Sequence, residues 1–220
     1  MTSQPEHVTV LDMDGVILKT NLTKYRAMLA LFSSFPDHRD RISRYILGRN
    51  GVRRDLKILG IHSEILGKSL ADGELEGYLE RYAIALEKEL SKAPLVDGVD
   101  RFIESHNGSL FVNSSAPSEE VERQLETRSL LQHFDGVFAG EADKRHGLER
   151  IRVLTEGKGV VFFGDSHGDL DAARLAKMAF VGVVAERDNF GDAPLIKIRD
   201  FADQAAVAEA IERSLAATSR

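Results

Sequence analysis

The 220-residue chain contains no cysteine, which excludes disulfide bonds, thiolate catalysis and thiolate zinc sites. No apolar stretch approaches the roughly 20 residues that a membrane span requires. The polar N-terminal residues MTSQPEH also lack the apolar core of a secretory signal. We therefore expect a cytoplasmic protein with no membrane partner.

The sequence also lacks low-complexity tracts and internal repeats, so neither disorder nor a solenoid is favoured. Its 43% hydrophobic and 29% charged residues are ordinary for a globular protein. The net charge of −6 argues against a nucleic-acid partner, because proteins bind the phosphate backbone mainly through clustered Lys and Arg side chains. The length suits one large domain, or one domain with a modest insertion.

The stretch HVTVLDMDGVIL, residues 7 to 18, places two carboxylates at the end of a short apolar run. Asp12 and Asp14 follow the run and precede Gly15, after which apolar residues resume. Desolvating a carboxylate is costly unless a cation or hydrogen-bond donors compensate. A positive group is therefore expected nearby, either a hard metal ion, a phosphate-handling lysine, or both.

From residue 94 onward, short apolar runs alternate with segments of helical character. Strands are expected at 109–114, 136–140, 159–165, 179–184 and 195–198, and helices at 118–131, 147–155, 170–177 and 203–215. This alternation predicts an α/β fold, a Rossmann-like parallel sheet with helices on both faces. Ligands of such sheets collect at the carboxyl ends of the strands.

Residues 19–93 show a different sequence pattern, in which apolar residues recur at helical spacing. Helix breaks are expected at Pro36, Gly48, Gly51, Gly60 and Gly73, which would leave four or five helices. We predict an α/β core made of residues 1–18 and 94–220, interrupted by a helical cap at 19–93. A connection of that length is expected to cover the site at the strand ends.

Several polar groups fall at the carboxyl ends of the predicted strands. They are Asp12 with Asp14, Ser114 with Ser115, Lys144, and Asp165 with Asp169. Each alone has an ordinary explanation as a turn residue, a helix N-cap or a surface lysine. Their convergence on one edge of the sheet is what indicates a site.

The order of these groups resembles the four motifs of the haloacid dehalogenase superfamily. DMDGV resembles the first motif, Ser114 in LFVNSSAP the second, Lys144 the third and GDSHGD the fourth. The third-motif lysine is often followed by Pro, whereas Arg145 follows here. Lys158 is a poorer candidate for that lysine because it precedes its strand.

The resemblance implies phosphoryl transfer. Asp12 would be the nucleophile that forms an aspartyl-phosphate, and Asp14 the general acid and then the general base. Within the superfamily, the second Asp separates phosphate-transferring members from true dehalogenases. Lys144 would neutralise charge on Asp12 and the phosphoryl group, while Ser114 would hydrogen-bond the phosphoryl oxygens.

The resemblance also implies a Mg²⁺ cofactor. Asp12, the backbone carbonyl of Asp14 and Asp165 resemble the magnesium ligands of the family. Asp169 is expected to orient a ligand water or the lysine rather than to bind the ion directly.

Some residues of the chain permit a functional and an ordinary interpretation. Arg49 and Arg53 lie in the basic run GRNGVRRDLK of the cap. They could hold a carboxylate or second phosphate of the substrate, or simply form a solvated face. For His146 and His167 we prefer surface and loop interpretations, because no metal-binding His pair such as HExxH is present.

The expected function is that of a Mg²⁺-dependent phosphomonoester hydrolase acting on a small phosphorylated metabolite, as a monomer or homodimer. A phosphomutase resembling β-phosphoglucomutase would share every core residue. A phosphonate-cleaving relative would need a cap lysine such as Lys57 or Lys68. A non-enzymatic receiver-like phosphate sensor is a distant alternative, because a receiver needs neither the second Asp nor a long helical lid.

Overall fold

The structure, a computed structural model, describes residues 7–49, 52–141, 143–156 and 158–218. The chain forms two compact units. The core unit comprises Met1–Lys19 and Pro94–Arg220, and the cap unit comprises Thr20–Ala93. The expected helix break at Gly51 and the polar residues 1–6 lie outside the described residues.

The core unit contains a six-stranded sheet with the strand order β3-β2-β1-β4-β5-β6. The strands are β1 (Val8–Leu11), β2 (Leu110–Ser114), β3 (Gly136–Ala139), β4 (Val160–Gly164), β5 (Ala179–Val183) and β6 (Lys197–Ile198). All neighbouring strands pair in parallel. The predicted α/β fold with a parallel sheet and a helical insertion between β1 and β2 is confirmed.

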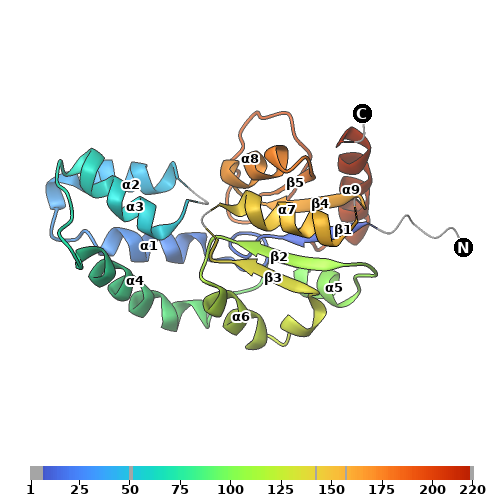
Figure 1. Cartoon of the computed structure of the whole chain (residues 1–220), viewed down its shortest axis with the longest axis horizontal. Coiled ribbons are helices and arrows are strands. Elements are labelled where there is room, and N and C mark those ends of the chain that lie inside the picture. Colours follow the sequence, from blue (N-terminus) through green and yellow to red (C-terminus); the bar gives the residue numbers. More distant parts are fainter. Residues whose placement is uncertain (1–6, 50–51, 142, 157, 219–220) are drawn as a thin grey trace, which may run out of the picture. The chain divides into compact units, whose positions relative to one another are not determined.

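Helices cover both faces of the sheet. On one face lie α5 (Val99–Glu104), α6 (Ser118–Glu126) and α9 (Gln204–Thr218), and on the other lie α7 (Lys144–Leu154) and α8 (His167–Leu175). Figure 1 shows α7 and α8 on the opposite side of the strands from α5 and α6. In β1, Val8 and Val10 pack toward α7 and α8, and Leu11 packs toward the other layer. This two-sided burial explains why three of the four residues of β1 are apolar.

Two helices begin three residues earlier than their apolar periodicity indicates. α7 starts at Lys144 because the Asp143 side chain accepts a hydrogen bond from Arg145 N at 2.8 Å. α8 starts at His167 because Ser166 and Asp169 form a reciprocal capping box. These N-caps place Lys144 and Asp169 in the first turns of their helices, rather than in the loops before them.

Two other elements are shorter than predicted. α6 ends at Glu126, and the chain then turns through Ser129, whose φ of 55° is left-handed and not helical. β6 is limited to Lys197 and Ile198, whereas four residues were expected. Neither difference lies at the carboxyl edge of the central strands.

The cap unit is helical, with α1 (Asn21–Ala30), α2 (Arg39–Leu47), α3 (Arg54–Gly60) and α4 (Glu74–Leu90). Gly60 does not interrupt the helix, because α3 continues directly into a π-helical segment at Ile61–Ile65. The unit has its own apolar core, which includes Met28, Ile42, Ile58 and Leu86. In the described ranges of the chain, no helix has the length and apolarity needed to cross a membrane.

Candidate active site

The carboxyl ends of three central strands meet at one edge of the sheet. Leu11 in β1 is in register with Val112 in β2 and Phe163 in β4. The backbone N–H of Asp12 continues this ladder by donating to Phe163 O at 2.9 Å. The residues that follow these register positions therefore emerge side by side, including Ser114 as the last residue of β2.

A tight turn follows β1 and keeps Asp14 close to the strand end. Gly15 has a φ of 77°, which favours glycine. Its N–H donates to Leu18 O at 2.8 Å, and Leu18 N donates back to Met13 O at 2.9 Å. Asp14 is half-buried within this closed turn.

Asp12 is the buried carboxylate at the end of β1, with 3% of its surface exposed. Its Oδ1 accepts a hydrogen bond from Met13 N at 2.7 Å and lies 2.8 Å from Lys144 Nζ. Burial, followed by the charges of Asp169 and Asp14, raises the pKa of Asp12 to about 7 against the opposing effect of Lys144. Lys144 alone therefore does not compensate the negative charge collected here.

Lys144, the first residue of α7, bridges two carboxylates. Its Nζ lies 2.8 Å from Asp12 Oδ1 and 2.5 Å from Asp169 Oδ1. Burial by itself would lower the pKa of Lys144, but attraction to these carboxylates outweighs burial and raises the pKa above its ordinary value. The side chain is thus a permanent cation within the site.

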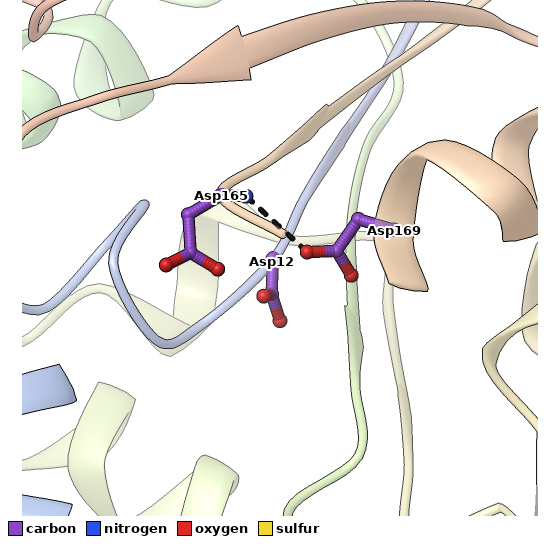
Figure 2. A group of neighbouring side chains, drawn as sticks. All are labelled: Asp12, Asp165 and Asp169. Carbon is purple, nitrogen blue, oxygen red and sulfur yellow. Dashed lines mark hydrogen bonds between the residues drawn. The ribbon is translucent and has the colours of Figure 1, made fainter. Parts of the chain in front are cut away.

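Asp169 is fully buried and anchors the loop between β4 and α8. Its Oδ2 accepts hydrogen bonds from Ser166 N at 3.0 Å, Ser166 Oγ at 2.6 Å and Asp165 N at 3.2 Å, the last drawn in Figure 2. A Cβ at Gly164 would lie 2.4 Å from the Cβ of Asp169. Gly164, the first glycine of GDSHGD, is therefore needed for the close approach of Asp169 to the strand.

The carboxylates of Asp12, Asp165 and Asp169 form a cluster in which one oxygen of each lies within 4.8 Å of the others. Figure 2 shows the three side chains converging from the ends of two strands and the start of α8. All three are buried, and Lys144 supplies one positive charge against them. Hard oxygen donors with excess negative charge fit a divalent cation such as Mg²⁺.

Two asparagines that the sequence patterns did not single out hold the backbone of this site. Asn113 Nδ2 donates to Lys144 O at 2.8 Å, and Asn189 Nδ2 donates to Asp165 O at 2.9 Å. A polar residue inside the apolar run at 109–114 is a signal that could have identified Asn113. Asn189 lies in a long polar loop and gives no such signal.

Ser114 and Ser115 end β2 beside these groups. Ser114 is buried, with 3% exposure, and its Oγ accepts a hydrogen bond from Ala116 N at 3.1 Å. Ser115 is half-buried. The hydroxyl of Ser114 thus already shapes the turn that leads toward α6.

The predicted cap arginines form ion pairs inside the cap unit. Arg49 lies 3.1 Å from Glu64, and its guanidinium stacks 3.6 Å from the ring centroid of Tyr45. Arg53 makes two hydrogen bonds to Asp55, at 3.1 and 2.9 Å. Both arginines therefore have cap carboxylates as partners.

The two histidines near the motifs are exposed. His167 begins α8, and its ring meets Phe190 edge-on at 5.7 Å between centroids. His146 lies in the first turn of α7. Neither belongs to the described cluster of possible metal ligands.

Comparisons with known proteins agree with this architecture. The family model described as haloacid dehalogenase-like hydrolase matches residues 9–183. That range begins within β1 and ends with β5, so it includes every site residue from Asp12 to Asp169. A search among curated proteins found no match.

Solved structures share the fold over nearly the whole chain. A Haemophilus somnus protein, itself a phosphoglycolate phosphatase only by prediction, has a TM-score of 0.73 at 16% identity, covering 94% of this chain and 99% of that one. A Thermotoga maritima protein provisionally described as a β-phosphoglucomutase has a TM-score of 0.66 at 22% identity, covering 93% and 98%. YfnB of Bacillus subtilis, provisionally described as a haloacid dehalogenase-type hydrolase and bound to magnesium, has a TM-score of 0.65 at 16% identity, covering 94% and 100%. At these identities the likeness shows the fold alone.

Proposed function

The chain belongs to the haloacid dehalogenase-like hydrolases, and from this premise we propose that it is a Mg²⁺-dependent phosphatase of small phosphorylated metabolites. The observation that carries the proposal is the buried Asp12, paired with Lys144 and followed two residues later by Asp14. A nucleophile, a fixed cation and a nearby acid are the groups that phosphoryl transfer through an enzyme carboxylate requires.

In the first step, Asp12 attacks the phosphorus of the substrate. Its Oδ1 is held by Met13 N and Lys144, so we assign the attack to Oδ2. The new bond joins Oδ2 to phosphorus, while the ester bond from phosphorus to the leaving oxygen breaks. Asp14 gives its proton to that oxygen, which leaves as an alcohol.

In the second step, a water molecule attacks the phosphorus of the aspartyl-phosphate. Asp14, now ionised, takes a proton from the water. The bond between phosphorus and Oδ2 breaks, so inorganic phosphate leaves and the Asp12 carboxylate is restored. Lys144 stays between Asp12 and Asp169 throughout and offsets the negative charge of the phosphoryl group.

We assign the metal ligands to Asp12, Asp165 and the backbone carbonyl of Asp14, with Asp169 orienting Lys144. The assignment of Asp169 is supported by its contacts, because Oδ1 meets Lys144 and Oδ2 accepts from the backbone of Asp165. When bound, Mg²⁺ supplies positive charge that allows a carboxylate and a phosphate to approach. Ser114 is assigned to the phosphoryl oxygens.

For the cap unit, we propose that Arg49 or Arg53 binds a carboxylate or a second phosphate of the substrate. Both guanidiniums already hold a carboxylate, Glu64 and Asp55 respectively. Arg53 binds its carboxylate through two N–H groups and Arg49 through one, so each guanidinium is already directed at an anion.

A phosphomutase is the second candidate, because the Thermotoga maritima protein that shares this fold is provisionally described as a β-phosphoglucomutase. It would use the same core residues but transfer the phosphoryl group to a second sugar hydroxyl instead of to water. Phosphate release distinguishes the two, because a mutase returns almost none.

The decisive experiment is colorimetric phosphate release from p-nitrophenyl phosphate and a panel of phosphorylated metabolites, with and without Mg²⁺. We expect Mg²⁺-dependent release that chelation abolishes and added Mg²⁺ restores. Asp12→Asn should abolish turnover, because an amide cannot form the acyl phosphate.

Asp97→Asn is the matched control, since Asp97 is an exposed carboxylate of the same unit that pairs with Lys19. The hydrolase proposal must be abandoned if no compound in the panel is turned over and Asp12→Asn behaves like the wild type. Conversion of a sugar phosphate to its isomer without phosphate release would favour the mutase.

A further inference from the structure

We propose that Asn113 is a positioning residue: its side-chain amide fixes the first turn of α7 and thereby holds the Lys144 ammonium between Asp12 and Asp169. The inference concerns the placement of Lys144, and only its kinetic consequence rests on the proposed phosphatase function. Asn113 is not one of the residues assigned to the reaction or to the metal, and it acts through the main chain of Lys144 rather than on a substrate.

Asn113 is 2% exposed and lies in β2 immediately before Ser114. Side chains of a strand alternate between the two faces of its sheet. Phe111 packs in the same apolar cluster as Leu148 of α7, whereas Val112 packs in the cluster on the opposite face. Asn113 therefore faces α7, in a layer that is otherwise apolar, where a buried amide requires a partner.

That partner is the backbone of α7. Asn113 Nδ2 donates to Lys144 O at 2.8 Å across 31 residues of sequence. The orientation of the amide follows from its chemistry, because only the NH₂ group can donate to a carbonyl oxygen. The bond fixes the position of the residue that carries the ammonium.

The helix also sits directly on the Asn113 side chain. A Cβ at Gly147 would lie 2.7 Å from Asn113 Oδ1 and 3.1 Å from the Cβ of Phe138. Glycine at this place in the first turn therefore lets α7 approach β2 closely. Contact and hydrogen bond together set the height of this turn above the sheet.

The backbone position of Lys144 is important because its flexible side chain must reach two carboxylates. Its Nζ lies 2.8 Å from Asp12 and 2.5 Å from Asp169. From the other side of the turn, the Asp143 side chain holds Arg145 N at 2.8 Å. Without the Asn113 bond, the first turn of α7 would lose this hydrogen bond to the sheet, and we expect the ammonium to be held less closely at both carboxylates.

The first test measures the accessibility of Lys144 without any assay of activity. The full chain, with no metal added, is treated with acetic anhydride, and acetylation of each lysine is followed by mass spectrometry. Wild-type Lys144 should react slowly because its amine is buried and charged. In Asn113→Ala, its rate should rise by about 10-fold as the first turn of α7 opens locally more often.

Ser214→Ala is the matched control. Ser214 is also buried and donates its hydroxyl hydrogen to a strand carbonyl, Phe180 O, at 2.9 Å. Phe180 is not one of the proposed site residues, so losing this bond should leave Lys144 labelling at the wild-type rate. Thermal unfolding of both variants confirms that each is folded when it is labelled.

The second test is a double-mutant cycle on kcat/KM for phosphate release. Asn113→Ala should lower kcat/KM by about 10- to 100-fold. In a Lys144→Met background the same substitution should change kcat/KM by less than about 2-fold, since its effect passes through Lys144. A merely structural role would lower activity equally in both backgrounds.

The inference is overturned if a folded Asn113→Ala protein labels Lys144 at the wild-type rate, or if Ser214→Ala accelerates labelling as much. It is supported if only the Asn113 variant accelerates labelling. Absence of phosphatase activity in the wild type would defeat the proposed function, while the labelling result would still decide the role of Asn113.

Discussion

Buried polar side chains are distributed unevenly between the two units. In the core unit, Asp12, Lys144, Asp165 and Asp169 are each at most 9% exposed. In the described part of the cap unit, the buried polar residues are Thr20 and His62. Charges of the cap pair at its surface instead, as Arg49 does with Glu64.

The difference has a physical meaning. Burying a charged side chain costs free energy unless partners hold it in a fixed geometry. The buried charges of the core unit are therefore already arranged before any ligand binds. Exposed ion pairs contribute little to stability, so the surface charges of the cap can change without unfolding it. We therefore expect changes in the core to alter turnover and changes in the cap to alter substrate affinity.

After the complete loss expected for Asp12→Asn, the largest predicted effect concerns Asp14 in the core. Asp14→Asn keeps the size of the side chain but removes the proton donor and acceptor, so kcat should fall by about 10²- to 10⁴-fold. Steady-state phosphate release measures this, with Asp97→Asn as the exposed control. A loss of less than about 10-fold would mean that another group transfers the proton.

The cap should give a smaller effect of a different kind. Arg49→Ala or Arg53→Ala should raise KM about 10-fold and leave kcat nearly unchanged, because a binding contact made equally in the ground and transition states is lost. Arg41→Ala, at an exposed position of α2, is the control. If both variants lower kcat at constant KM, the division of roles between the units is wrong.

The smallest predicted effect is on the pH dependence of the free energy of unfolding, which one buried histidine in each unit should influence. Burial lowers the pKa of His106 in the core, helped by His7, and burial also lowers the pKa of His62 in the cap, where aromatic rings surround it. Each imidazole therefore stays neutral in the folded protein below pH 6.5, where the unfolded chain takes up a proton. The free energy of unfolding should fall as pH drops below about 6.5.

His106→Gln and His62→Gln should each flatten this acid-side decline. Thermal unfolding between roughly pH 5 and pH 8, about 1.5 pH units either side of the ordinary histidine pKa, would measure this. If the units unfold separately, each substitution should flatten only the transition of its own unit. If stability declines equally with falling pH in both variants and in the wild type, other titratable groups cause the decline.

The sequence predicted most of the fold because the core strands are short, mostly apolar runs and the insertion has helical periodicity. It misplaced the starts of α7 and α8, since their first turns are set by Asp143 and Ser166 rather than by apolar residues. The family resemblance, carried by short motifs, is confirmed by the match over residues 9–183.

The charged residues of the candidate site could be predicted from the sequence, but the residues that position them could not. Asp12, Lys144 and Asp169 follow strands, so the topology of a parallel sheet alone brings their segments to one edge. The role of Asn113 depends on β2 packing against α7, and the need for Gly164 depends on α8 approaching β4. Such contacts join segments whose spacing in sequence carries no periodic signal.

The clash that a side chain at Gly164 would create has a practical consequence for laboratory evolution. Any larger residue at position 164 would clash with Asp169, which forms an ion pair with Lys144. His167 and Gly168, in contrast, are exposed in the first turn of α8. A randomised library across this segment should therefore return diverse codons at 167 and 168 but a single amino acid at 164, whatever substrate is used for selection.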